Sequence, residues 1–263
     1  MLEAALFPQL DLPDPPDGFP YQVRHGDGYQ IGFTRGYPFA SVVVRRLAED
    51  ETATRVAEVR ALLAGLGFER AAWVVSEAAE PDGVASRLRA EGLVPWEEKA
   101  EGLEARSRQM TLVTEPAPAP EGAVARQAES EEEFVTAFRV AQEAFDLSEQ
   151  ARRTFEERQA ELWRWQQRFP DFRTFIAFVD GEIVGNASTV FGANAAYMMG
   201  GSVRADSRGR GAYRALVRAR WDAAVERGIP ALTVTAGSMS APVLERLGFV
   251  TACWVDTLSD RFS

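Results

Sequence analysis

Apolar residues in the second half of the chain first recur at helical spacing. Phe134, Phe138 and Phe145 fall on one face of residues 130–145, and Ser130 followed by Glu133 is the capping-box pattern of a helix start. Residues 148–168 carry a second apolar face at the same period. The pattern therefore predicts two consecutive helices after a short strand at 123–128.

Strand-like segments follow these helices. Asp180-Gly181 is a hairpin turn signal between residues 171–178 and 183–190. Residues 195–203 are almost uncharged, as expected for a buried central strand. The later segments read as a helix at 211–227, a strand at 231–236, a helix at 240–247 and a strand at 249–258. The order predicted for this half is β-α-α-β-β-β-α-β-α-β.

The first half repeats the end of this succession. The sequence predicts strands at 29–33 and 39–45, a helix at 52–66, a strand at 71–76, a helix at 83–91 and a strand at 103–113. RLRAEGLV at 87–94 is similar to VLERLGFV at 243–250. We interpret this as a diverged internal duplication, with the alternative that α/β segments simply look alike.

A Pro/Ala-rich segment, TEPAPAPEG at 114–122, separates the halves, because alternating proline cannot sustain a helix or a sheet ladder. We therefore expect a first domain at 1–115, a linker at 116–122 and a second domain at 123–263.

Composition excludes several classes of function. The net charge of −10 argues against nonspecific nucleic-acid binding, and no apolar run reaches the length of a membrane span. Cys253 is the single cysteine, so no intramolecular disulfide or cysteine-based metal site can form. We expect a cytoplasmic protein without a metal, a nucleic-acid partner or a membrane partner.

The segment from Ser202 to Leu216 carries the clearest chemistry, because a buried strand runs through Arg208-Gly-Arg-Gly211 directly into a helix. Glycines allow a sharp turn, and a helix N-terminus presents unpaired N–H donors and a partial positive charge. The segment thus predicts a site for a pyrophosphate-sized anion. The dinucleotide pattern G-x-G-x-x-G is not met because Arg214 stands at the third glycine position, and no P-loop motif is present.

This segment resembles the signature of the GNAT acetyltransferase superfamily, Arg/Gln-x-x-Gly-x-Gly/Ala after a valine-ended strand. Val203, Arg208 and Gly211 match, whereas Tyr213 replaces the last small residue. Residues 231–236 and the helix ending in Leu-Gly-Phe249 resemble the family's next strand and helix, so the resemblance covers residues 122–263. It implies an α/β (α+β) GNAT fold, a mixed and mostly antiparallel sheet flanked by helices, with a second, partial GNAT-like lobe at the N-terminus.

The resemblance also implies acetyl-CoA as the substrate that donates the acetyl group. Main-chain groups of the central strand would pair with the pantetheine arm, and the turn and first helical residues would hold the pyrophosphate. In the family, the central strand splays from the next strand, and the acetyl group lies in that V-shaped opening. The implied cofactor-binding residues are Gly201, Ser202, Val203, Arg208, Gly209, Arg210, Gly211, Ala212, Tyr213 and Arg214.

The family's catalytic groups are not evident in this sequence. Many members use a tyrosine as the acid that protonates the leaving thiolate, and Leu244 stands in its place. Asp146, between the first two helices, and Ser240, at the start of the last helix, are the remaining catalytic candidates, and Glu143 is a further acid near the acceptor. Each has the alternative of a solvated side chain or a helix cap.

The resulting hypothesis is an N-acetyltransferase that acts on a primary amine of a small molecule or peptide, with one cofactor site. The first half would be a degenerate lobe, since the acids at 49–51 start its equivalent helix and would repel pyrophosphate. The alternative is a GNAT-fold module that senses acyl-CoA without catalysis. A homodimer through the final strand is a further expectation.

Overall fold

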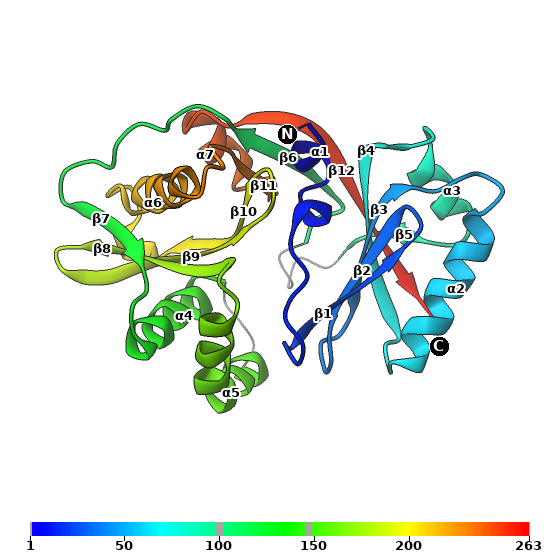
Figure 1. Ribbon diagram of the computed structural model, residues 1–263, viewed down its shortest axis with the longest axis horizontal. Coiled ribbons are helices and arrows are strands. Elements are labelled where there is room, and N and C mark those ends of the chain that lie inside the picture. The colour runs from blue at the N-terminus through cyan, green and yellow to red at the C-terminus, as the bar shows by residue number, and fades with distance from the viewer. Residues whose placement is uncertain (1, 98–102, 146–148, 263) are drawn as a thin grey trace.

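The computed structural model describes residues 2–97, 103–145 and 149–262, and it places two lobes side by side (Figure 1). In the second half the order of elements is the one predicted. These elements are β7 (Ala123–Gln127), α4 (Glu131–Phe145), α5 (Glu149–Arg168), β8 (Phe172–Val179), β9 (Glu182–Phe191), β10 (Ala196–Val203), a 3-10 turn η2 (Ala205–Ser207), α6 (Ala212–Glu226), β11 (Leu232–Ala236), α7 (Ala241–Arg246) and β12 (Val250–Arg261).

The first half contains a comparable set of elements. They are α1 (Leu2–Leu6), the 3-10 turn η1 (Pro8–Asp11), β1 (Tyr21–Gly26), β2 (Tyr29–Thr34), β3 (Ala40–Arg46), α2 (Thr52–Gly65), β4 (Arg70–Glu80), α3 (Val84–Ala90), β5 (Val94–Pro95) and β6 (Arg106–Leu112). No described helix is long and apolar enough to cross a membrane.

Across the described residues, one mixed sheet runs through both lobes in the order β1-β2-β3-β4-β12-β6-β11-β10-β9-β8-β7, with β5 beside β12. Only β3–β4 and β10–β11 pair in parallel among the described strands, and the other pairs are antiparallel. The predicted class, a mostly antiparallel sheet flanked by helices with a second N-terminal lobe, is confirmed.

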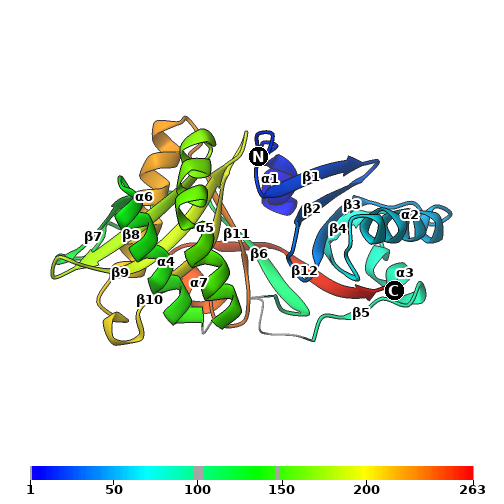
Figure 2. The ribbon, with the colours of Figure 1, turned by 90° about the horizontal axis from the view of Figure 1, so that it is seen from below.

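The two halves exchange their last strands. β6 belongs to the first half but pairs with β11, and β12 belongs to the second half but pairs with β4. β6 and β12 also pair with each other and join the lobes, as Figures 1 and 2 show. The folded lobes therefore do not divide strictly at the Pro/Ala-rich linker, and the proposed domain boundary stays a prediction.

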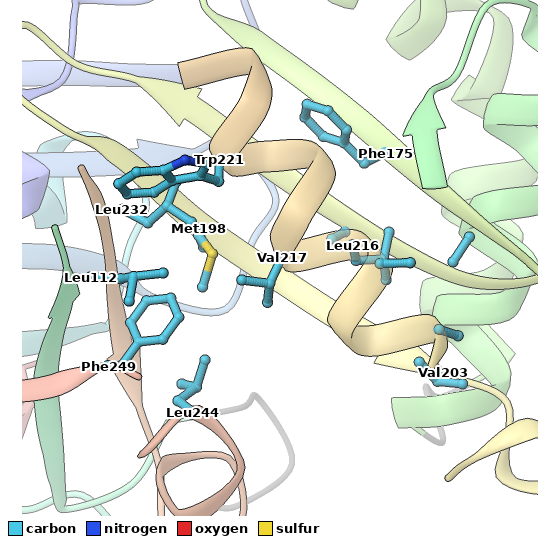
Figure 3. Close-up of a cluster of buried hydrophobic side chains, with 14 of the residues drawn as sticks. Leu112, Phe175, Met198, Val203, Leu216, Val217, Trp221, Leu232, Leu244 and Phe249 are labelled. Carbon is cyan, nitrogen blue, oxygen red and sulfur yellow. The ribbon is translucent and has the colours of Figure 1, made fainter. Parts of the chain in front are cut away.

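Helices cover both faces of the second lobe's sheet. α6 packs on β7 to β10, and α4 packs on the opposite face against β8 to β10 (Figure 1). Figure 3 shows the core beneath α6, where Val217 and Trp221 lie next to Met198 and Leu232, and Leu216 lies nearer the start of the helix. These residues are at most 5% exposed, so the sheet and α6 form a rigid support for the residues at their ends.

Capping explains why α4 starts where the sequence predicts. Ser130 Oγ accepts a hydrogen bond from the Glu133 N–H at 3.2 Å, and the Glu133 carboxylate accepts one from the Glu129 N–H at 2.8 Å. Arg126 Nη2 donates a hydrogen bond to the other oxygen of this carboxylate, Oε1, at 2.5 Å. The capping-box prediction is confirmed. The Glu133 carboxylate binds the N–H of Glu129, the residue before the cap Ser130, instead of the N–H of Ser130 itself.

Candidate acetyl-CoA site

Strands β10 and β11 form a fork. Their parallel pairing is limited to Ala196–Leu232 and Tyr197–Thr233, at the start of both strands. Beyond these two pairs, β10 continues to Val203 along β9, whereas β11 continues along β6. The edge of β10 that faces β11 therefore has no strand partner beyond residue 197 among the described residues. Its main-chain groups have no neighbouring strand to bind and can pair with an extended ligand.

A β-bulge interrupts β10 within this open stretch. The register with β9 shifts between Met199 and Ser202, and Gly200 has a φ of +54°. This left-handed conformation favours glycine, which has no Cβ to clash with the backbone. Past the bulge, the buried Ser202 donates to Asn186 Oδ1 at 2.6 Å and fixes the strand to β9. The bulge changes the direction of the main-chain groups on the unpaired edge of β10 inside the fork.

The glycine-rich turn lies at the wide end of the fork. Gly209 and Gly211 both have positive φ, +78° and +89°, and Gly211 is the residue before the first turn of α6. Arg208 is exposed and donates from Nε to Val203 O at 3.4 Å, and Arg210 pairs with Asp180 at 2.5 Å. Arg214 is exposed on the first turn of α6. The turn thus presents a helix N-terminus with three arginines at or next to it, as an anion site requires.

Tyr213 departs from the family pattern, and its ring packs on β10. A Cβ added to Gly201 would lie 3.0 Å from Tyr213 Cε2, so a side chain at 201 would displace this ring. Arg220, further along α6, is 1% exposed and donates from Nε to Leu216 O at 3.0 Å. Burial lowers the pKa of Arg220, and the neighbouring Tyr213 hydroxyl raises it. Tyr213 therefore forms part of the wall between α6 and the open strand.

The structure describes Ser240 and Glu143, two of the three catalytic or acceptor-site candidates named from the sequence. Asp146 lies outside the described residues. Ser240 precedes α7, and its hydroxyl donates to Gly237 O at 3.4 Å without capping the helix. Glu143 pairs with Arg204 at 3.1 Å. Leu244, at the position of the family's tyrosine, is fully buried in the core. A catalytic role for Asp146 or Ser240 stays a prediction.

A polar cluster that the sequence does not predict bridges the fork where the strands separate. The Tyr197 hydroxyl lies 3.2 Å from Thr235 Oγ1 on β11. Thr235 donates to Gln109 Oε1 of β6 at 2.9 Å. Gln9 of η1 donates from Nε2 to Tyr197 and Thr235, at 3.3 and 3.4 Å. The four residues belong to four segments far apart in the sequence, so no motif or spacing could have indicated them.

The equivalent strands of the first lobe do not form a fork. β3 and β4 pair in parallel from Ala40–Ala71 to Val44–Val75 without interruption. α2 begins after Glu51, in a segment without a glycine-rich turn. The first lobe therefore lacks both the separated strands and the glycine-rich turn that would allow an extended, phosphate-bearing ligand to bind at β10 and α6.

The described residues contain no group of three His, Cys, Asp or Glu side chains arranged to hold a metal ion. The fork and its turn instead consist of main-chain groups, glycines and arginines. That donor set suits a ligand with an anionic group and an amide-bearing chain.

Comparison with known proteins agrees with this geometry. Residues 143–257 match the family described as acetyltransferase (GNAT) domain. A GCN5-related N-acetyltransferase from Kribbella flavida is similar in structure, with a TM-score of 0.71 at 16% identity, covering 98% of this chain and 95% of its own. A conserved protein of unknown function from Staphylococcus epidermidis has a TM-score of 0.64 at 8% identity, covering 91% and 93%.

A third similar structure is a tandem GNAT protein from the clavulanic acid biosynthesis pathway, solved without AcCoA. It has a TM-score of 0.61 at 16% identity and covers 99% of this chain and 93% of its own. No curated protein sequence matches the chain. These identities support a common fold and not a common substrate. Residues 143–257 therefore contain a GNAT acetyltransferase domain, and the similar structures show that the chain as a whole has the two-lobed form of this fold.

Proposed function

We propose that the protein is an N-acetyltransferase that transfers the acetyl group of acetyl-CoA to a primary amine of a small molecule or peptide. The observation that carries this proposal is the fork. β10 leaves β11 after two residue pairs and exposes a bulged main-chain edge that leads to the glycine-rich turn before α6. A plain structural sheet would gain hydrogen bonds by closing this gap, as β3 and β4 do.

The fork and the turn together give the direction of the bound substrate. The pyrophosphate would lie on the N–H groups of residues 209–213, with Arg208, Arg210 and Arg214 as countercharges. The pantetheine arm would extend from there along Gly201, Ser202 and Val203, so its thioester end would point to the place where the strands meet. The amine then attacks the thioester carbonyl, the C–S bond breaks, and the proton of the amine passes to solvent or to a protein group.

The anion site is tested with two substitutions of one glycine. Gly209 has positive φ and open space around its Cα, and Asn and Asp both tolerate this conformation. Gly209→Asn and Gly209→Asp therefore have nearly the same shape and differ by one negative charge. Acetyl-CoA at about 100 times its Kd should stabilise the wild-type protein by about 2.7 kcal/mol, or about 5–10 °C in Tm. We expect Gly209→Asn to keep most of this shift and Gly209→Asp to lose it.

Two results would contradict this proposal. One is the absence of a thermal shift for the wild-type protein at millimolar acetyl-CoA. The other is an equal shift in the Asn and Asp variants, which would place the pyrophosphate away from the turn. Calorimetric titration adds a stoichiometry. We expect one acetyl-CoA per chain because, among the described strands, β10 and β11 separate whereas β3 and β4 stay paired.

A non-catalytic acyl-CoA sensor is the alternative function, favoured by Leu244 in place of the family's tyrosine. Release of free CoA from acetyl-CoA in the presence of a panel of primary amines distinguishes the two. Amine-dependent release above the rate without protein supports the enzyme, whereas tight binding without release supports the sensor.

A further inference from the structure

The hydroxyl of Tyr197 lies at the base of the fork. Tyr197 is paired with Thr233, yet its hydroxyl contacts Thr235, two residues further along β11. The side chain therefore leans from β10 across to β11 and toward the end at which the strands separate. Met198, the next residue, faces α6 in the core, so Tyr197 projects from the opposite face of the sheet.

The protons of the cluster can be assigned from its hydrogen bonds. The single hydroxyl proton of Thr235 is directed to Gln109 Oε1, because Gln109 Nε2 is engaged with Val234 O at 3.2 Å. Tyr197 must then be the donor in its contact with Thr235. Gln9 Nε2 also reaches the oxygens of both Tyr197 and Thr235.

In this arrangement the hydroxyl of Tyr197 can rotate and direct its proton to an acceptor other than Thr235. If it moves from Thr235 to another acceptor, Thr235 still accepts from Gln9 Nε2 and no buried oxygen is left unpaired. Burial raises the pKa of Tyr197, while the hydrogen bonds with Thr235 and Gln9 lower it. Tyr21 of β1 is the other titratable group with an electrostatic interaction with Tyr197. The hydroxyl is thus protonated at neutral pH and supported by a donor behind it.

We propose that Tyr197 is the catalytic residue that donates its hydroxyl proton to the sulfur of CoA as the thiolate leaves, with Gln9 as its positioning residue. This inference rests on the proposed function, because the thioester must lie at the base of the fork. The N–C bond forms at the carbonyl, and the C–S bond breaks with its electron pair on sulfur. Sulfur takes the Tyr197 proton, and a water molecule returns the proton of the amine to the phenolic oxygen.

The role is tested without knowing the acceptor, by comparing CoA with an analogue that lacks the sulfur atom. Their affinities are measured by calorimetry at about pH 9, where a large share of thiols is ionised. A hydrogen bond to a charged group contributes about 1.5–3 kcal/mol, so the wild-type protein should prefer CoA about 10- to 100-fold. Tyr197→Phe should lose this preference and still bind the analogue as the wild type does. Tyr21→Phe, which removes the neighbouring hydroxyl outside the cluster, should keep it.

The outcomes separate the two proposals. If the wild-type protein binds neither ligand, the proposed function is wrong and this inference falls with it. If it binds both but shows no preference for CoA, or if Tyr197→Phe keeps the preference, acetyl-CoA binding stands and the role of Tyr197 is wrong. Gln9→Ala serves as a second variant and should reduce the preference only in part, because Tyr197 remains.

Discussion

Pro120 of the linker occupies the space that a side chain at Gly211 would need. A Cβ added to Gly211 would overlap the Pro120 ring, whereas nothing lies within 4 Å of the equivalent position at Gly209. Gly211 precedes the first turn of α6, so the linker packs directly against the turn that we assign to the pyrophosphate. The linker thus does more than connect the halves, because it fixes the start of the helix on which the anion site depends.

We expect Gly211→Ala to destabilise the fold by about 2–4 kcal/mol, since it combines a left-handed backbone with overlap against Pro120. Gly209→Ala is the matched control, with a similar φ but open space, and should cost about 1–2 kcal/mol. Urea unfolding of the two variants measures the difference. Equal losses in the free energy of unfolding for the two variants would show that Pro120 moves away from the turn without destabilising the fold.

Asp260 anchors the exchanged strand β12 in the first lobe. It is 1% exposed and accepts hydrogen bonds from Arg60 Nη2 at 2.7 Å and from Trp73 Nε1 at 3.3 Å. Asp260→Asn leaves Arg60 without its charge partner, so we expect a loss of about 2–3 kcal/mol in the free energy of unfolding. Asp256→Asn, on the same strand in a more exposed pair with Arg89, should cost less than about 1 kcal/mol. Equal losses in the free energy of unfolding for Asp260→Asn and Asp256→Asn would show that the buried pair of Asp260 and Arg60 does not anchor β12.

Local signals predicted most of the secondary structure. The periodicity of Phe134 and Phe138, the capping box and the Asp180-Gly181 turn are each carried by neighbouring residues, and each is found in the structure. The apolar pattern predicts no strand before residue 29, yet β1 covers Tyr21–Gly26. Its side chains are mostly half-buried or exposed, so it lacks the alternation that identifies a strand.

Long-range features of the site could not be predicted in this way. The exchange of β6 and β12 depends on which sheet edge each strand pairs with. The apolar pattern of each strand is compatible with the sheet of its own lobe and with that of the other lobe. The cluster around Tyr197 joins Gln9 to Thr235, 226 residues apart. The resemblance to a family did indicate the turn at Arg208 to Gly211, because that part of the site is contiguous in the sequence.

Glu133 should make the stability of the second lobe sensitive to acid. Its hydrogen bonds with Arg126 lower the pKa of Glu133 from 4.5 to about 2. Because the folded pKa is below the unfolded one, the stabilisation is present above about pH 5 and is lost as the pH falls toward 2. Glu133→Gln should cost about 1 kcal/mol at pH 7, discounted for the part-exposed Arg126, and progressively less below pH 5.

Denaturant unfolding between pH 7 and pH 2.5 measures this convergence. Glu129→Gln is the control, since its carboxylate is 75% exposed and 3.8 Å from Arg126, and it should leave stability unchanged at every pH. A constant difference between Glu133→Gln and the wild type across this range would show that the carboxylate charge is not the cause.

The strand exchange predicts that neither half folds by itself. Residues 123–263 alone would lose β6 from the edge of β11 and would leave β12 without β4, although Leu258 of β12 is fully buried in the core of the first lobe. Exposing this apolar strand and a bare sheet edge favours aggregation over a native state. We expect residues 123–263 alone to show no cooperative thermal transition and co-expression with residues 1–122, which include the linker, to restore one, as followed by near-ultraviolet circular dichroism. A cooperative transition of residues 123–263 alone at the Tm of the whole chain would mean that the second lobe completes its sheet without the first.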